Sequence, residues 1–529
     1  MAVTETKPPE APEQGTQTAT SPAERQPGEL ETLIGTGDHT SIGRLYIGFS
    51  LLLLLAGLIA RILTGLDSAT DGGILGESYQ LLVDSSSLVA LVFLGVIPLL
   101  LGVATLIVPL QVGSPTIAFP RAAALAMWSW LVFGAIFITS TALDGGIGGN
   151  DLDAATLGNV SLGAMMVALA LGSVCVATTV VSHRPEGMGL NRTPLFAWSM
   201  LVASAIWIVS LGSALAWSII GHLEADSTGA LVDNFSVGLG WLLRGPAVYM
   251  LAIPVLGIAG DAVATATGRP LKNFGAFQAM IGGFGIFSFG AWAQNPGSVN
   301  TILWALWALA IFLPLLGLLG GLAESMRHGK VRLTAALVGS LLGLLNLLGA
   351  ATVGLLMALN TAGEGNLFDF SSAQLSKAQV IFVVTAAVAG ALAGIAHWSP
   401  QIWGAPAADT GASISIGMVD VGGGLVATVL AIEVFVQAGG DNTGDAIFGG
   451  FEAAGALLAL AGIAGALASY LGATRDPEAD DDSDVDSDEA PSGMTLEWQV
   501  DFPASAGGRT VAVGAVESPY PLYESTEDA

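Results

Sequence analysis

The stretch WLLRGPAVYMLAIPVLG, residues 241–257, is apolar throughout except for Arg244 and the Gly-Pro pair that follows it. Runs of about 18 or more mostly apolar residues are long enough to cross a bilayer as helices, and such runs recur along the whole chain. Of the 529 residues, 53% are hydrophobic and only 11% are charged. This composition excludes a soluble globular protein and predicts an all-α membrane protein.

We expect twelve transmembrane helices. A helix rises about 1.5 Å per residue, so each apolar segment can cross a hydrocarbon core of about 30 Å. Glycine and alanine are frequent within the segments, which allows close helix packing in lipid. The predicted spans are 42–64, 87–110, 122–143, 157–181, 195–220, 236–259, 273–292, 300–322, 332–358, 377–397, 413–437 and 447–472.

Polar segments flank the predicted transmembrane domain, residues 41–475. Residues 1–40 are mostly polar and lack the apolar core of a signal peptide, which predicts a disordered cytoplasmic tail. Residues 476–492 carry a run of aspartate and glutamate that is typical of a solvated linker. Residues 493–529 regain aromatic side chains, and we expect them to form a peptide that docks on a partner.

The charge distribution predicts partners and orientation. The net charge of −27, from 43 acidic and 16 basic residues, disfavours nucleic acid as a partner and suits the high-salt cytoplasm of a halophilic prokaryote. The positive-inside rule places the arginine- and lysine-rich loops in the cytoplasm, so a multi-pass protein of the plasma membrane with both termini cytoplasmic is expected. Those loops contain Arg44, Arg121, Arg184, Arg192, Arg269, Lys272, Arg327, Lys330, Arg332 and Arg475.

Six short motifs, in register from about residue 38 to residue 499, resemble subunit I of the haem–copper respiratory oxidases, of the aa3-type cytochrome c oxidase kind. They are DHTSIGRLY (38–46), IVPLQVGSPTIAFPR (107–121), RPEGMGLNRTPLFAW (184–198), GPAVYMLAIPVLGI (245–258), AHWSPQIWG (396–404) and TLEWQ (495–499). The resemblance implies twelve helices in three arcs, two haems, copper and magnesium, and O₂ reduction coupled to proton translocation. It also implies subunit II-like and III-like partners, with lipid around the helices.

The metal-binding positions depart from the family pattern. The family binds its haems and copper through six histidines, and neutral imidazole is the usual ligand for such metals. Ser86 and Ser87 stand where the second-helix haem histidine is expected, and residues 371–382 contain none of the tenth-helix histidines. The copper-ligand positions hold Gly245, Gln294 and Asn295. The chain's five histidines, none of them at a motif ligand position, are His39, His183, His222, His328 and His397.

Few family site residues are kept. Tyr249 matches the family's active-site tyrosine, and Asp369 matches the aspartate of its magnesium-binding pair. No confident catalytic residue and no bound cofactor or metal is therefore predicted. We expect a haem-free, non-catalytic paralogue that acts as a scaffold; an active oxidase with unusual ligands is the first alternative.

Charged residues inside the spans suggest two further hypotheses, because such residues are costly in lipid and often functional. Arg244 could fill the former copper site together with Gln294 and Asn295, or it could extend to the membrane interface. Asp420 and Glu433 lie in the eleventh predicted span and could handle protons. The second functional alternative is therefore a proton or ion conductor on the same scaffold.

Overall fold

In the computed structural model the described helices belong to one compact unit within Gly37–Ala529. All regular elements within the described residues are helical, and those residues contain no strand. The structure describes residues 35–70, 73–75, 77–147, 149–228, 239–243, 245–292, 301–361, 372–438, 445–473, 493–500, 503–504 and 513–523.

Eleven helices within the described ranges are long and apolar enough to cross a membrane, which confirms the all-α, multi-span architecture. The count of twelve is not reproduced. The predicted span 273–292 corresponds to α10, whose described apolar stretch, Phe274–Ser288, is shorter than the other spans. The helices of the first half are α2 (His39–Ala69), α3 (Glu77–Val89), η1 (Ala90–Val96), α4 (Ile97–Gln111), α5 (Pro120–Ala142), α6 (Leu152–Ser182), η2 (Leu190–Arg192), α7 (Leu195–Thr228) and α9 (Pro246–Thr267). Those of the second half are α10 (Phe274–Trp292), α11 (Thr301–Ala310), α12 (Phe312–His328), α13 (Ala335–Thr361), α14 (Ser372–His397), α15 (Ser399–Trp403), α16 (Asp409–Ala438), α17 (Asp445–Ala473) and η4 (Leu496–Gln499).

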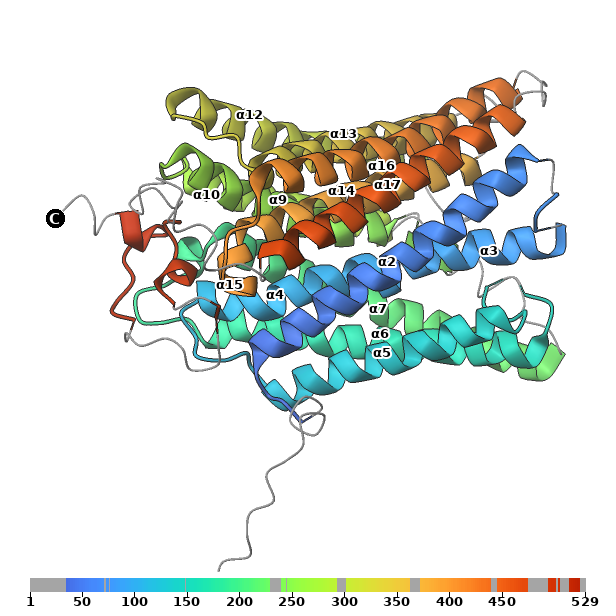
Figure 1. The fold of residues 1–529 in the computed structure, drawn as a ribbon, viewed down its shortest axis with the longest axis horizontal. Helices are drawn as coiled ribbons and strands as arrows, with labels where there is room; N and C mark the ends of the chain where they lie inside the picture. Colours follow the sequence, from blue (N-terminus) through green and yellow to red (C-terminus); the bar gives the residue numbers. More distant parts are fainter. Residues whose placement is uncertain are drawn as a thin grey trace, which may run out of the picture. The chain divides into compact units, whose positions relative to one another are not determined.

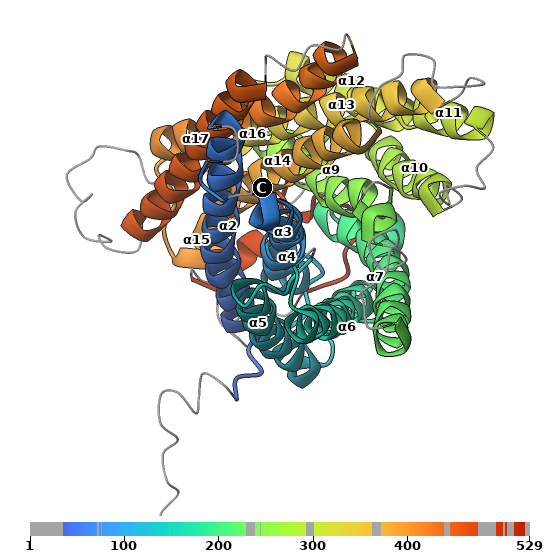
Figure 2. The same cartoon turned by 90° about the vertical axis from the view of Figure 1, so that its right-hand side faces the viewer.

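One span lies entirely inside the helical unit. The π-helical segment η1 joins α3 to α4, so that Leu82–Gln111 is one continuous span, and its most apolar stretch is fully buried by other helices. Pro98, at the start of α4, has no N–H to donate, which is consistent with the altered hydrogen bonding of η1 just before it. The helices α2, α6, α7 and α14 pack against α4 (Figure 2).

The remaining helices surround this central span. The helices α5, α6 and α7 pack side by side in chain order, and α13, α14 and α16 form a second group of neighbours. The last long helix, α17, packs on both α16 and α2, so the two ends of the transmembrane chain lie side by side (Figure 1). Residues far apart in sequence therefore meet between α2, α14, α16 and α17.

The first motif acts as a helix cap. The Asp38 carboxylate accepts hydrogen bonds from the backbone N–H groups of Thr40, at 3.0 Å, and Ser41, at 3.1 Å, at the start of α2. Burial raises the pKa of Asp38, but the hydrogen bonds from Thr40 and Ser41 outweigh burial and hold the pKa below its ordinary value. An ionised aspartate thus stabilises the positive end of the helix dipole.

The described parts of the C-terminal segment contact the helical domain of the same chain. The Ala504 N–H donates to the Gln401 carbonyl oxygen at 2.9 Å, and the Arg44 guanidinium donates to the Ala504 carbonyl oxygen at 2.8 Å. The Val516 N–H donates to the Glu186 carbonyl oxygen at 2.9 Å. Docking of this segment on a partner stays a prediction.

Candidate functional site

The residues singled out from the sequence separate into three groups. Arg244, Gln294, Asn295 and Asp369 lie outside the described residues. Gly245 and Tyr249 lie together at the start of α9 and line one cavity. Asp420 and Glu433 both lie on α16, but 13 positions apart, which corresponds to about 20 Å along a helix.

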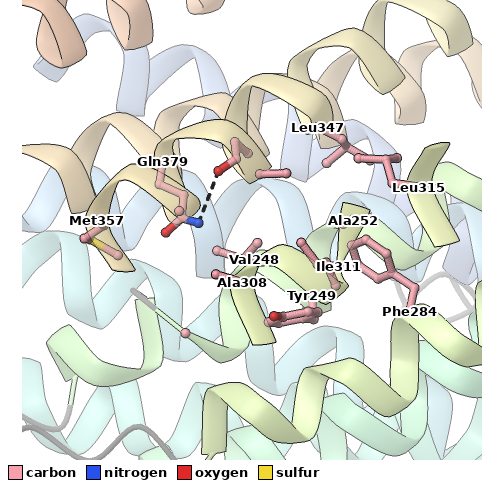
Figure 3. A pocket seen from close by; sticks show the side chains of 14 residues that line it. Val248, Tyr249, Ala252, Phe284, Ala308, Ile311, Leu315, Leu347, Met357 and Gln379 are labelled. Carbon is pink, nitrogen blue, oxygen red and sulfur yellow. Dashed lines mark hydrogen bonds between the residues drawn. The ribbon is translucent and has the colours of Figure 1, made fainter. Parts of the chain in front are cut away.

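The cavity beside Tyr249 is small and largely apolar. Its volume is about 50 Å³, enough for a few water molecules. Figure 3 shows Tyr249, Phe284 and Gln379 around it, and the rings of Tyr249 and Phe284 lie with centroids 5.5 Å apart. The Gln379 amide donates to the Ala350 carbonyl oxygen at 3.2 Å. Gly245, at the copper-ligand position of the motif, contributes no side chain to this cavity.

A second cavity, of about 320 Å³, is much more polar, and we call it the charged cavity. It is formed by α2, α3, α14, α16 and α17, near the end of the bundle where α2 and α16 end and α14 and α17 begin. Of the described residues that line it, Leu430 alone is apolar. The lining consists of Arg61, Thr64, Ser68, Gln80, Asp84, Gln374, Lys377, Leu430, Glu433 and Glu452.

Four of these residues form a chain of alternating charge. The Lys377 ammonium donates to one carboxylate oxygen of Asp84 at 2.5 Å, and the Arg61 guanidinium donates to the other. A second nitrogen of Arg61 donates to Glu452 at 3.2 Å. The order Lys377–Asp84–Arg61–Glu452 therefore connects α14, α3, α2 and α17 through charge-assisted hydrogen bonds.

The four charged residues lie well inside the helical bundle, which explains why their charges are paired. Lys377 lies five residues into α14 and Glu452 seven residues into α17, which is about 8–11 Å along each helix. Only 7% of the Arg61 side chain is exposed. An unpaired charge at that depth is costly in a membrane, so the four residues neutralise one another.

The charged cavity lies next to both positions where the motifs place low-spin haem histidines. Ser86 and Ser87 are buried on the same turn of α3 as Asp84, and Lys377 lies within residues 371–382. The Ser86 hydroxyl accepts from the Ile147 N–H at 3.1 Å, and the Ser87 hydroxyl donates to the Asp84 carbonyl oxygen at 2.8 Å. Both hydroxyls are thus used for backbone hydrogen bonds.

Asp420, the other carboxylate of α16 singled out from the sequence, is buried and bonded to a neutral partner. The Asn346 side chain of α13 donates to one of its oxygens at 2.5 Å. A smaller cavity of about 40 Å³, lined in part by Arg61, Thr385 and Glu452, shares Arg61 and Glu452 with the charged cavity. Residues of α2, α14, α16 and α17 contribute to its lining. Asp420 does not line that cavity.

A third polar group lies at the opposite end of the bundle. The Gln111 side-chain amide donates to Asp261 at 2.9 Å and to Glu497 at 3.0 Å, and its oxygen accepts from the Ala197 N–H at 3.0 Å. The indole N–H of Trp398 donates to Glu497 at 3.2 Å. Burial raises the pKa of Glu497 above its ordinary value, although the hydrogen bonds from Gln111 and Trp398 act in the opposite direction.

Sequence reasoning missed most of these polar residues. Arg61 and Lys377 lie at or near the ends of the predicted spans 42–64 and 377–397, and they take part in buried or half-buried ion pairs. Asp84 and Glu452 were not among the candidate site residues named from the sequence. The available signal was a charged residue within or beside an apolar segment, which in a membrane protein predicts a partner.

Comparison with known proteins gives the family. The sequence profile described as "Cytochrome C and Quinol oxidase polypeptide I" matches residues 41–435, about three quarters of the chain. A Streptomyces avermitilis protein, named as a candidate cytochrome c oxidase subunit 1-beta, is 29% identical over 333 residues, covering 56% of this chain and 58% of that protein. The "Heme-copper oxidase subunit I+III" of Aeropyrum pernix is 24% identical over 404 residues, covering 70% of this chain and 48% of that protein.

The "Cytochrome c oxidase subunit 1" of Corynebacterium glutamicum is 25% identical over 303 residues, covering 53% of this chain and 52% of that protein. The chain thus spans about half the length of the curated relatives that it matches. The profile match extends from α2 into α16 and includes the helices around the cavity beside Tyr249. It also includes four of the five helices that form the charged cavity, while α17 follows the matched residues. This multi-span helical chain therefore belongs to the family of subunit I of cytochrome c and quinol oxidases.

Proposed function

We propose that this protein is a subunit I-like component of a prokaryotic respiratory oxidase complex that binds no haem or copper and reduces no O₂ itself. Its role is then that of a scaffold. The observation that carries the proposal is the charged cavity, in which Lys377, Asp84 and Arg61 occupy the region where the family motifs place the low-spin haem ligands.

The chemistry of the two cavities supports the haem-free proposal. Haem iron in proteins is held by histidine, cysteine, methionine or tyrosine, and the described lining of the charged cavity supplies none of these. Around the cavity beside Tyr249, the described side chains of those types are Tyr249 and Met357. A volume of about 50 Å³ holds a few waters, whereas a porphyrin is many times larger than a water molecule. The described residues therefore do not fit the family's haem and copper set.

The membrane arrangement and partners belong to the same proposal. We propose that both termini face the cytoplasm and that subunit II-like and III-like proteins bind the scaffold, with residues 493–529 taking part. The filling of the former copper site by Arg244, Gln294 and Asn295, and a cation at Asp369, stay hypotheses, since these four residues lie outside the described ranges.

The test is a pyridine haemochrome assay combined with metal analysis of the purified, washed protein. We expect far less than one haem and one copper per chain. A subunit I relative that binds haem, purified in the same way, is the positive control. A stoichiometric haem would overturn the proposal and favour an active oxidase with unusual ligands.

A proton conductor is the second candidate, and Asp420 is the observation that favours it. Its carboxylate is buried in α16 beside Asn346, and a buried carboxylate in a membrane helix is a common element of proton relays. If the chain conducts protons through this group, Asp420→Asn is expected to lower proton flux into liposomes at least tenfold. Glu324→Gln, at an exposed site, is the matched control. Equal flux in the two variants would exclude Asp420 from such a path.

A further inference from the structure

The charged cavity has a size and polarity that fit a small ligand. Its volume of about 320 Å³ lies at the lower end of the range of about 300–1,000 Å³ found for ligand pockets. Leu430 is its single apolar residue among those described, so most of the lining surface is polar. The Lys377 side chain is 42% exposed, which gives the cavity a route to its surroundings. The lining therefore selects a small and strongly polar molecule.

The Lys377 ammonium is the donor in the cavity with unused capacity. It carries three N–H groups, and the described structure uses one of them, on Asp84. The Arg61 guanidinium uses its two terminal nitrogens on Asp84 and Glu452. Because the Lys377 side chain is accessible and positively charged, this side of the cavity favours a ligand with anionic oxygens.

The total charge argues against a simple anion. Arg61 and Lys377 contribute two positive charges, and Asp84 and Glu452, to which they donate, contribute two negative charges. An added anion would leave this group with a net negative charge in a site of low dielectric. Glu452 accepts from Arg61 through one oxygen, Oε2, and its Oε1 has no hydrogen bond in the described structure. A positively charged donor can be held there.

A simple cation fits no better. It would have to enter beside the Arg61 guanidinium, which is buried in the wall of the cavity. The described residues also contain no group of three or more histidine, cysteine, aspartate or glutamate side chains arranged to hold a metal ion. A molecule with both charges avoids each difficulty, because its net charge is zero and its two ends have separate partners.

We propose that the charged cavity binds a small zwitterion with one ammonium group and one anionic oxygen group, such as a short amino acid or a phosphoethanolamine headgroup. Its anionic oxygens accept hydrogen bonds from the Lys377 ammonium, and its ammonium group donates to Glu452. This inference rests on the haem-free proposal, because a haem in the same region would leave no room for the ligand.

The test measures binding to the purified full-length protein in detergent by calorimetry and by thermal unfolding. Glycine, L-serine and phosphoethanolamine are the probes, with acetate, methylammonium and L-leucine as single-charge and bulky controls. We expect at least one probe to bind at least tenfold more tightly than every control and to raise the unfolding temperature with concentration. No binding by any probe, or equal binding of acetate, would overturn the proposal.

Variants locate the site. Lys377→Met is expected to weaken binding of the best probe at least tenfold, and Glu452→Gln to weaken it while leaving acetate binding unchanged. Lys330→Met removes an exposed lysine after α12 and should leave the affinity unchanged. Equal affinity in Lys377→Met and the wild type would overturn the assignment, and the comparison of probes on the wild type stands even if a variant fails to fold.

Two sources of the ligand are separated by analysis of co-purifying lipid. If the headgroup of a phospholipid fills the cavity, lipid with an ethanolamine headgroup is retained by the wild type and lost from Lys377→Met. If a free solute fills it, the retained lipid is the same in both. The haemochrome assay on the same sample keeps the two proposals distinct: haem present contradicts the proposed function, whereas haem absent without zwitterion binding contradicts this inference alone.

Discussion

Replacing Asp84 by alanine is expected to lower the thermal stability of the protein more than any other single change in the charged cavity. The substitution removes the carboxylate that accepts from both Arg61 and Lys377. Breaking a buried ion pair from one side costs about 3–5 kcal/mol, and the lower end applies here because 18% of the Asp84 side chain is exposed. The unfolding temperature in detergent measures the effect.

An exposed acid provides the control for Asp84. Glu324 lies 3.8 Å from Lys272, and the two side chains are 42% and 67% exposed. Glu324→Ala should cost less than about 1 kcal/mol, because water screens exposed ion pairs. The double variant Asp84→Ala with Lys377→Met should be less damaging than the sum of the single variants, since the residues are in contact. Similar unfolding temperatures for Asp84→Ala and Glu324→Ala would contradict the buried ion-pair chain.

Replacing Gln111 by leucine is expected to release the C-terminal segment. The amide of Gln111 is the donor shared by Asp261 and Glu497, and all three side chains are buried. Leucine leaves two neighbouring carboxyl groups each short of a hydrogen bond, at about 1–3 kcal/mol for each group. Glu497 connects the segment 493–500 to the helical domain through its hydrogen bonds to Gln111 and Trp398. Loss of the Gln111 bond should therefore make this segment more sensitive to protease. Cleavage rate and unfolding temperature measure the two effects.

The matched control for Gln111 is Gln80. Its side chain makes a long hydrogen bond of 3.4 Å to Ser68 and is only half-buried. Gln80→Leu should therefore leave the cleavage rate of the C-terminal segment unchanged. If Gln111→Leu is cut no faster than Gln80→Leu, Gln111 does not hold the segment.

The sequence predicts the local features of this fold well. Apolar length predicts the spans because burial in lipid requires about 20 apolar residues wherever a helix crosses. The helix start at His39 has a local cause, because Asp38 caps residues two and three positions later, but the prediction of a disordered tail over residues 1–40 did not include it. Asp420 could also be selected from the sequence, because a carboxylate within a predicted apolar span is visible without knowledge of the fold.

The candidate sites are not predictable in this way, because their contacts are distant in sequence. Arg61 and Glu452 are 391 positions apart, and Gln111 and Glu497 are 386 positions apart. No local pattern relates such residues, and only the packing of α17 on α2 and of η4 on α4 brings them together. The sequence indicates that a charge in a span needs a partner, but the fold decides which residue it is.

Because α17 packs on α2, Arg61 is synthesised long before its partner Glu452. At about 5–20 residues per second, the 391 positions between Arg61 and Glu452 take roughly 20–80 seconds to translate. Lys377 is 293 positions from Asp84 and is equally absent while the first helices enter the membrane. Asp84 follows Arg61 by only 23 positions, within the hairpin of α2 and α3. This early pair is the contact that shields the guanidinium from lipid until the last helices emerge from the ribosome.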